Sequence, residues 1–528
     1  MSTRRALLLT AAALPFPVWG DLTWNAAGPT NNWGTEVGNT NWLPGNVTWS
    51  QNENAIFNGT PETVTVTTAT TFNDMTFGAG GFTIAGGAGS FNLANDLAST
   101  ITVTNAADTA TIAETIANNT GGLSSLTKAG AGTLFLSGAN TYTGQTLVTA
   151  GTLKLGNGAA TGAGGAAAET IVSSGATVDL NSQAVTTTEI FRIAGTGVGN
   201  GGAMINTGAD QLNSINRLEL TADATIGGAG RFDIRPGTTP TLDLAGNTLT
   251  KIDGNQVSLV GAQVTNGNIV INGGIFSIET TTAVGGTGTI TINNGGSLGV
   301  WGNVSPNVTR PIVANAGSQF YNLNNASSID SNITLNGMVT FLGGANQTYL
   351  GVISGTGNIN KTGTLLTLGG ANTFTGATIA TGGTLALDYS TSDTSKLSDT
   401  GALILNNTTL QMTGSSGSHV ELVGPVTING VSNITPNGSE SRHDRPRQLR
   451  DERLAERPIS RLGDDDETEQ RSRLPPPHLV PRCRIRRQRR HRENRRGVRR
   501  HLRRCHQSVL GHESHPLGHR IHRPHHRG

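Results

Sequence analysis

The chain has 528 residues, of which charged residues make up 14% and aromatic residues 4%, while glycine alone contributes 72. Thr, Val and Ile favour strands, and Gly and Asn favour turns, so this composition excludes an ordinary helical enzyme and a helical membrane bundle and predicts an all-β chain. The net charge of +2 averages two unlike parts: residues 439–528 hold 25 Arg against 12 acidic residues, whereas residues 1–438 hold 12 basic against 23 acidic residues.

The first 20 residues have the pattern of a signal peptide. Arg4 and Arg5 form a charged region, an apolar run follows at 6–14, and Val18 and Gly20 stand where small residues favour cleavage. We therefore expect removal of residues 1–20 and a secreted, extracellular or outer-membrane-surface location. The alternative is a short buried segment behind a misassigned start. No later apolar run is long enough to span a bilayer as a helix.

Residues 21–120 are expected to form an N-terminal cap and the first coils of the fold. This part contains four tryptophans, namely Trp24, Trp33, Trp42 and Trp49. One interpretation is that they seal the edge of the first coil, which would otherwise invite strand addition. The other is a platform on which sugar rings stack, which would make the chain a glycan-binding module. We favour the cap.

Residues 121–436 show self-similarity at a period of 19–22 residues. Gly132–Leu136 (Gly-Thr-Leu-Phe-Leu) recurs as Gly151–Leu155 (Gly-Thr-Leu-Lys-Leu), with the leucines on one side of a strand and Phe135 and Lys154 on the other. The period is too long for a hairpin and too short for a βαβ unit. It predicts a β-solenoid, in which each coil pairs with its neighbours and aliphatic side chains stack inward.

Two stretches match each other more closely than a coil requires. Residues 138–155 and 370–387 are identical at 12 of 18 positions, and each follows a lysine, Lys128 or Lys361. The pattern resembles the autotransporter-associated β-strand repeat, also called the passenger-associated transport repeat, near 126–155 and 359–387. The resemblance implies a right-handed parallel β-helix carried on a secreted or outer-membrane-displayed protein, and it implies no enzyme activity.

Within this repeat, the residues suggest structural roles. The amides of Asn140 and Asn372 can bond corner backbone and stack between coils. Tyr142 and Phe374 are expected to cover a corner, with stacking on a ligand as the alternative.

The solenoid shows no recognisable catalytic motif, so we predict no catalytic, cofactor-binding or metal-binding residues. Acid–base chemistry on a β-helix would need two carboxyls close together. The densest group of acids and arginines lies at 189–253, where Asp233 and Arg235 share one strand face. We interpret them as a solvated ion pair on an outer sheet. The only histidine of residues 1–438, His419, has no visible catalytic partner.

The solenoid pattern stops near residue 436, and we expect residues 437–528 to be a disordered basic tail. It holds 25 Arg, no Lys, no aromatic residue and both cysteines. Because Arg, His and Pro increase together while Lys vanishes, we interpret this tail as out-of-frame translation. The alternatives are an arm that binds nucleic acid or another polyanion, and a metal site using Cys483, Cys505 and His506.

The sequence thus predicts an all-β, right-handed parallel β-helix that acts as a non-catalytic structural or adhesin-like passenger. We expect a monomeric rod, without cofactors, whose candidate partners are extracellular glycans or other surface proteins. Nucleic acid is expected as a partner only if the Arg-rich tail is genuine. The alternative functions are a β-helical polysaccharide-degrading enzyme and the glycan-binding module described above.

Overall fold

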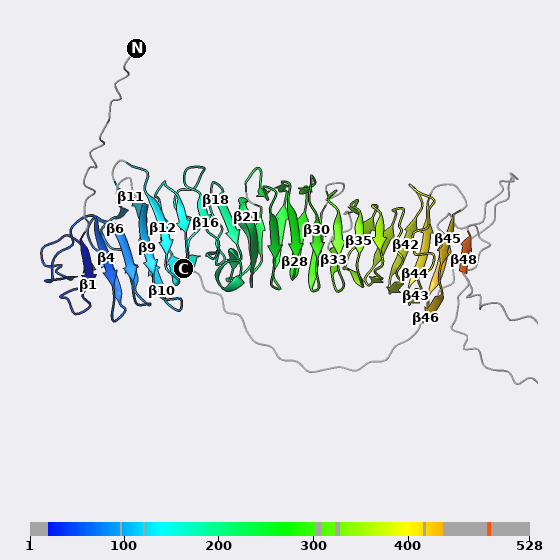
Figure 1. Cartoon of the computed structure of the whole chain (residues 1–528), viewed down its shortest axis with the longest axis horizontal. Coiled ribbons are helices and arrows are strands. Elements are labelled where there is room, and N and C mark those ends of the chain that lie inside the picture. Colours follow the sequence, from blue (N-terminus) through cyan, green and yellow to red (C-terminus); the bar gives the residue numbers. More distant parts are fainter. Residues whose placement is uncertain are drawn as a thin grey trace, which may run out of the picture. The chain divides into compact units, whose positions relative to one another are not determined.

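The computed structural model describes residues 20–94, 98–119, 122–235, 237–302, 308–322, 328–414, 419–436 and 483–486. These residues form a parallel β-solenoid of about 16 turns (Figure 1). Within them, the only helical element is the short 3-10 helix η1 (Val198–Asn200). The predicted all-β parallel solenoid is confirmed. No described helix is long and apolar enough to cross a membrane.

The strands stack into ladders in which each strand pairs in parallel with one from the preceding and one from the following coil. Ladder one comprises β1 (Asp21–Trp24), β4 (Glu53–Phe57), β6 (Thr70–Phe77), β9 (Ala98–Val103), β12 (Ser125–Ala129), β14 (Thr146–Val148), β16 (Thr170–Val172), β18 (Ile190–Gly195), β21 (Arg217–Gly228), β23 (Thr241–Asp243), β26 (Gln263–Val264) and β29 (Ala283–Val284). Ladder two comprises β2 (Asn32–Trp33), β5 (Thr63–Val66), β7 (Thr83–Ala85), β10 (Thr109–Ile112), β13 (Thr133–Leu136), β15 (Thr152–Leu155), β17 (Thr177–Asp179), β19 (Met204–Asn206), the second half of β21, β24 (Thr248–Lys251), β27 (Asn268–Ile271), β30 (Ile290–Ile292), β32 (Ile312–Ala314), β35 (Ile333–Leu335) and β38 (Ile353–Gly355).

Further ladders complete the coils. Ladder three comprises β20 (Gln211–Ile215), β22 (Phe232–Ile234), β25 (Gln256–Val260), β28 (Gly274–Glu279), β31 (Gly296–Trp301), β33 (Gln319–Asn322), β36 (Val339–Leu342), β39 (Ile359–Lys361), β41 (Thr378–Thr381), β43 (Leu403–Asn406) and β46 (Val426–Asn429). Ladder four comprises β34 (Ser328–Ile329), β37 (Gln347–Tyr349), β40 (Leu365–Leu368), β42 (Thr384–Asp388), β44 (Thr409–Thr413) and β47 (Asn433–Pro436). Near the N-terminal end, β8 (Phe91–Leu93) and β11 (Ile116–Asn118) continue from the first half of β6, and β3 (Trp42–Leu43) pairs antiparallel with β1.

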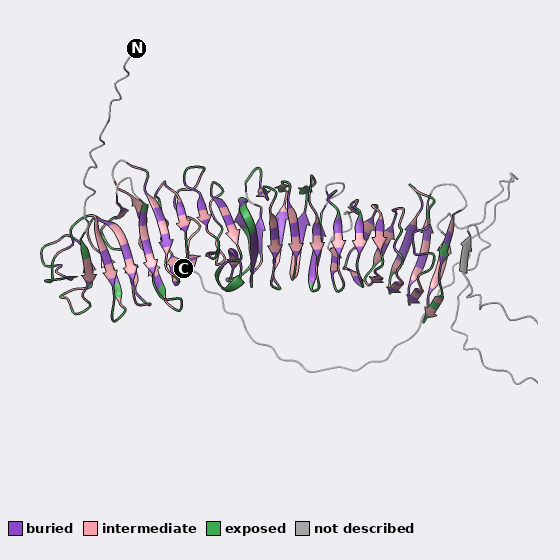
Figure 2. Ribbon diagram, viewed as in Figure 1, coloured by how far each residue is buried: buried purple, intermediate pink, exposed green. Residues whose placement is uncertain are grey.

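The core is a continuous column inside these ladders, and alternation along each strand builds it. In β13, Leu134 and Leu136 are buried while Thr133 and Phe135 are partly exposed. Parallel register then stacks Leu134 on Leu153 of the next coil. Buried and partly exposed residues accordingly alternate along many of the strands (Figure 2). Because one coil alone cannot bury these side chains, stability comes from repetition.

The C-terminal tail contributes one described element. Residues 483–486 form β48 (Cys483–Arg486), which pairs antiparallel with β45 (Val420–Val423). The rest of the predicted tail (437–528) lies outside the described residues, as does the predicted signal peptide up to residue 19.

Candidate functional site

The lysine of each predicted repeat is buried and bound by backbone carbonyl groups. The Nζ of Lys128, on β12, donates to the carbonyl oxygens of Ala129 (2.8 Å) and Gly130 (2.8 Å) and, from the next coil, Ala150 (3.0 Å). The Nζ of Lys361 likewise donates to Gly363 and Gly382, at 2.6 and 2.5 Å. Each lysine therefore ties its own corner to that of the following coil. Burial lowers the pKa of both lysines to about 8, so both ammonium groups remain mostly protonated at pH 7.

A third lysine, Lys251, makes the same kind of contacts, although it was not among the residues predicted from the sequence. The Nζ of Lys251, on β24, donates to the carbonyl oxygens of Ile252, Asp253 and Gly273. Leu249-Thr-Lys251 matches Leu126-Thr-Lys128, and residues 249–278 align with 126–155 without a gap. We call 249–278 the middle copy. The available signal was this Leu-Thr-Lys triplet, followed at equal distances by Gly-Ala and by a further glycine.

The predicted inter-coil role of the repeat asparagines is confirmed. The Oδ1 of Asn140 accepts the backbone N–H of Ile116 from the preceding coil (2.8 Å), and its Nδ2 donates to the carbonyl of Ala160 from the following coil (2.6 Å). Asn372 makes the equivalent pair of contacts with Ile353 and Lys396, both at 2.9 Å. Each amide thus joins three consecutive coils.

The repeat aromatics and glycines are also structural. Tyr142 and Phe374 are buried at 0% and 2% exposure, which leaves no ring face for a ligand and supports the corner-covering role. The hydroxyl of Tyr142 bonds that of Thr146 at 2.6 Å. Gly151 has a φ of +63°, and a Cβ there would lie 2.4 Å from the carbonyl oxygens of Gly130 and Gly132. Only glycine fits this close approach between coils.

The four early tryptophans form an internal aromatic cluster. Trp24, Trp33, Trp42 and Trp49 are at most 3% exposed. The rings of Trp33 and Trp42 have centroids 5.0 Å apart in an edge-to-face arrangement, and Trp33 also contacts Trp49 and Phe91. Rings buried in this way cannot stack on a sugar. The tryptophan platform was therefore wrong, while the cap interpretation stays a prediction with which this buried cluster agrees.

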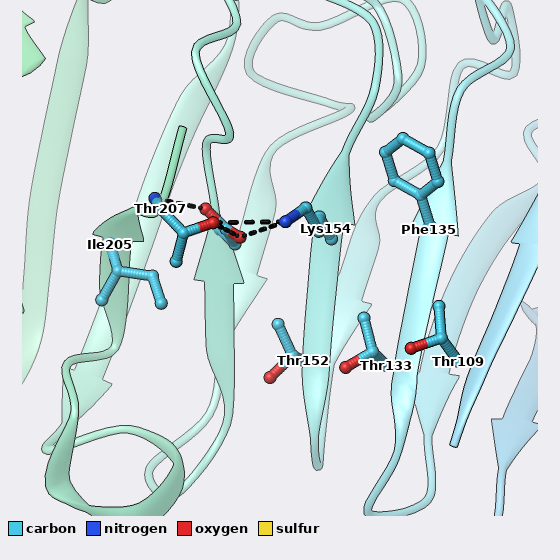
Figure 3. Close-up of a pocket in the computed structure, with 8 residues that line it drawn as sticks. Thr109, Thr133, Phe135, Thr152, Lys154, Ile205 and Thr207 are labelled. Carbon is cyan, nitrogen blue, oxygen red and sulfur yellow. Dashed lines mark hydrogen bonds and ion pairs between the residues drawn. The ribbon is translucent and has the colours of Figure 1, made fainter. Parts of the chain in front are cut away.

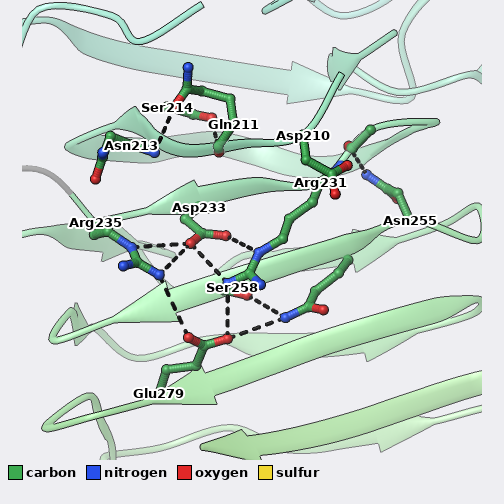
Figure 4. Close-up of polar contacts among 12 residues, drawn as sticks. Asp210, Gln211, Asn213, Ser214, Arg231, Asp233, Arg235, Asn255, Ser258 and Glu279 are labelled. Atoms are coloured by element: carbon green, nitrogen blue, oxygen red, sulfur yellow. Dashed lines mark hydrogen bonds and ion pairs between the residues drawn. The ribbon is translucent and has the colours of Figure 1, made fainter. Parts of the chain in front are cut away.

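The Asp233–Arg235 pair belongs to a denser network than predicted (Figure 4). Both carboxylate oxygens of Asp233 accept from Arg231, at 2.7 and 3.0 Å, and Oδ2 also accepts from Arg235, at 3.1 and 2.8 Å. Glu279, on β28, accepts from Arg231 and Gln256, both at 3.2 Å. Asp233 is 0% exposed, so the interpretation as a solvated pair was wrong. The residues that surround Asp233 come from three consecutive coils.

This network limits what the carboxylates can do. Burial raises the pKa of Asp233, while hydrogen bonds and the positive charges of Arg231 and Arg235 oppose that rise. A general acid or base must exchange a proton with a substrate. Four guanidinium contacts occupy the Asp233 oxygens instead.

The other acids predicted around 189–253 do not converge on one point. Arg192 lies between Glu169 (2.8 Å) and Glu219 (3.2 Å), and Arg217 pairs with Glu219. The remaining members bind backbone N–H or hydroxyl groups of neighbouring coils; they are Glu189, Asp210, Asp223, Asp243 and Asp253. Asp179, which precedes this stretch, does the same.

His419 has partners that the sequence did not indicate. Its Nδ1 lies 2.8 Å from Asp393, and its ring stacks on Tyr389 with centroids 4.7 Å apart. The buried Glu421 accepts hydrogen bonds from the Tyr389 hydroxyl and from the backbone N–H of Lys396. The cluster closes a corner near the end of the solenoid. Burial raises the pKa of Glu421, although several hydrogen bonds oppose this.

No group of three or more His, Cys, Asp or Glu residues in the described part of the chain is arranged to hold a metal ion. Of the three residues in the hypothetical metal site of the tail, Cys505 and His506 lie outside the described residues. Cys483 is described only as part of the backbone of β48.

The outer face of ladder two carries a groove of about 480 Å³ (Figure 3). We call it the threonine groove. It is lined by Thr109, Thr133, Phe135, Thr152, Lys154, Asp179, Ile205 and Thr207. Phe135 and Lys154 therefore face outward, as predicted from their alternation with leucines.

Comparison with known proteins agrees with the repeat geometry. The family model of the passenger-associated-transport-repeat matches residues 126–155 and 359–387. Neither a curated protein nor a solved structure matches the chain. The chain therefore contains two passenger-associated-transport repeats, at the positions where the sequence predicted them.

Proposed function

We propose that this protein is an exported, non-catalytic passenger-type solenoid that acts as a structural or adhesin-like element at the cell surface or in the extracellular medium. The observation that carries the proposal is the pair of passenger-associated-transport repeats built into a parallel solenoid. Their lysines, asparagines and glycines all join coils. The repeat thus serves to extend a scaffold, and its outward positions differ between the two copies.

The absence of catalysis is part of this proposal. Its support is the pairing of Asp233 with two arginines, which occupies the carboxylate that an acid–base mechanism would need to be free. The test is to incubate the purified full chain with a broad panel of neutral and acidic polysaccharides and to assay new reducing ends and unsaturated products. We expect none. Product formation by the wild type that is lost in Asp233→Asn would establish the enzyme alternative instead.

The location is tested on intact producing cells. A tag inserted at the exposed Val431 should be reached by antibody without permeabilisation, or should appear in the medium. Proteinase K added outside should remove the surface signal while a cytoplasmic marker survives. A tag that is detected only after permeabilisation contradicts the proposal.

The adhesive part needs a binding measurement. Labelled full chain should bind glycan-bearing surfaces or cells saturably, and an equal amount of unlabelled chain should compete. If the chain reaches the surface but binds nothing, the adhesin-like role is refuted and the structural role remains.

A further inference from the structure

The threonine groove is distinguished by residues that the repeat itself does not require. Phe135 and Lys154 face outward in the first repeat, where the second repeat has Thr367 and Ala386. The middle copy has Ser258 and Ser277 at the same places. The inward positions are aliphatic in all three copies, apart from Phe276. Because coils also form with Thr, Ala or Ser at the outward positions, coil formation does not require the aromatic ring, whereas the cation pairs with Asp179 of the next coil.

The groove has no unbalanced charge. The Nζ of Lys154 lies 3.3 Å from Oδ2 of Asp179 and 3.2 Å from the Thr207 hydroxyl. Asp179 is 3% exposed, and its Oδ1 accepts the backbone N–H groups of Asn181 and Thr207, both at 3.0 Å. The carboxylate is therefore satisfied, and it neutralises the lysine. A strongly anionic ligand would have to compete with Asp179, whereas a neutral ligand would not.

One side of the groove is a row of hydroxyl groups in register. Thr109, Thr133 and Thr152 stand opposite one another on β10, β13 and β15, with adjacent strands about 4.8 Å apart. Figure 3 shows the row on one side of the groove and Phe135 and Lys154 on the other. A repeating ligand lying across the strands would therefore meet a hydroxyl group at each coil.

Phe135 supplies an apolar surface beside this row. Its ring lies over Gly156 on the next coil, where a Cβ would be 2.7 Å from two ring atoms. The missing side chain at Gly156 thus leaves room for the ring against the next coil. Hydroxyl groups beside an aromatic ring suit a ligand that is itself polyhydroxylated but has apolar faces.

We propose that the threonine groove binds a neutral polysaccharide chain that lies across the strands of ladder two. This inference rests on the proposed adhesin-like function and gives it a site and a ligand class. Phe135 contacts a sugar face, and the threonine hydroxyls and the Lys154 ammonium bond sugar hydroxyl groups.

The test compares two variants of the full chain with the wild type. Phe135→Thr/Lys154→Ala places the outward residues of the second repeat on the first. Asp179 loses its cation but keeps the hydrogen bonds from Asn181 and Thr207, so the variant should still fold. Trp301→Ala is the matched control, because Trp301 is 42% exposed and belongs to ladder three, outside the groove. The probes are defined neutral oligosaccharides (glucan, mannan and galactan fragments) together with sulfated and uronate-containing ones, measured on an array and by calorimetry. Hydrogen exchange confirms that each variant is folded.

We expect the wild type and Trp301→Ala to bind a neutral oligosaccharide equally. The groove variant should bind it at least about tenfold more weakly, since losing one aromatic contact alone changes affinity by this order. Preference for sulfated or uronate probes overturns the ligand class. Binding that survives in the groove variant, or is lost in Trp301→Ala, overturns the site while leaving the adhesin-like function intact. A wild type that binds no probe but still binds cells refutes the neutral-glycan inference alone, whereas one that binds neither refutes the adhesive function as well.

Discussion

Replacing Lys128 by methionine tests whether the buried lysines hold the repeat coils together. Methionine is similar in length and remains apolar, so it fills the space without creating a large cavity. It removes the three N–H donors that bind the carbonyl oxygens of Ala129, Gly130 and Ala150. The variant therefore isolates the polar contribution of the side chain.

The magnitude follows from two opposing effects. Leaving a buried acceptor without a partner costs about 2 kcal/mol, so three carbonyl groups cost about 6 kcal/mol. Methionine also removes the penalty of burying an ammonium group. That penalty lowers the lysine pKa from 10.5 to about 8, which corresponds to about 3 kcal/mol. The difference predicts that Lys128→Met destabilises the folded state by about 3 kcal/mol.

The assay is hydrogen exchange in a series of urea concentrations, because it reports on each coil separately. In a solenoid each coil contacts only its neighbours, so protection should fall first in peptides from 98–155 and remain in 359–387. Arg217→Met is the control. The Arg217 side chain is 45% exposed, and its loss should cost less than about 1 kcal/mol. Unchanged protection around Lys128, or an equal loss along the whole chain, would refute the reasoning.

The same variant gives a second readout through pH. Between the folded pKa of about 8 and the ordinary value of 10.5, the unfolded chain binds more protons at Lys128 than the folded chain does. Stability therefore increases with pH in this window. From pH 7 to about 9.5 each such lysine adds about 2 kcal/mol to the free energy of unfolding. The increase over this range should therefore be about 2 kcal/mol smaller in Lys128→Met than in the wild type. The series stops there because burial raises the pKa of Tyr142, which opposes the trend at higher pH.

Three further predictions concern buried polar and aromatic residues. Burial raises the pKa of Glu189 to about 7, so the protonated carboxyl contributes stability that is fully present below about pH 4.5 and is lost as pH rises through 7. Glu189→Gln should therefore raise the free energy of unfolding by about 3 kcal/mol at pH 8 and leave it unchanged at pH 4, as measured by urea titration. Trp33→Ala should cost about 4 kcal/mol and unfold the N-terminal cap, seen as early proteolysis before residue 94 while later coils persist; an intact cap would contradict its role in the aromatic cluster. Asn140→Asp keeps the acceptor for Ile116 but turns a donor into an acceptor facing the carbonyl of Ala160, so it should lose at least about 2 kcal/mol in thermal unfolding, and a variant as stable as the wild type would show that the bridge is not needed.

The sequence was informative wherever the structural signal lies within one coil or recurs at the coil period. Alternation predicted that Leu134 and Leu153 point inward, and the recurrence of Asn140 predicted a corner role. It was uninformative where a residue depends on particular partners one or two coils away. Asp233 looked solvated because Glu279, 46 residues further on, completes the network that covers it. His419 lacked a partner in the sequence because Asp393 reaches it only after the chain has completed a coil.

The buried lysines were the least predictable feature for a related reason. A lysine in an apolar pattern is expected at the surface, since burying its charge is costly. Here the compensation comes from backbone carbonyl groups, which are present in every sequence and leave no residue-specific trace. The available signals were the lysine that precedes each predicted repeat, Lys128 or Lys361, and the recurrence of Leu-Thr-Lys at Lys251.

The three copies of this arrangement show how the scaffold separates structure from recognition. The lysine strand belongs to ladder one in the first repeat (β12), to ladder two in the middle copy (β24) and to ladder three in the second repeat (β39). The repeat motif can therefore occupy any ladder of the coil. Its lysine and glycine contact backbone groups, which every ladder presents in the same way, and its leucines point into the shared core. Outward residues have no such equivalence, since each ladder presents its own surface. A binding surface is thus expected in the outward residues of one ladder, as in the threonine groove, and not in the repeat motif itself.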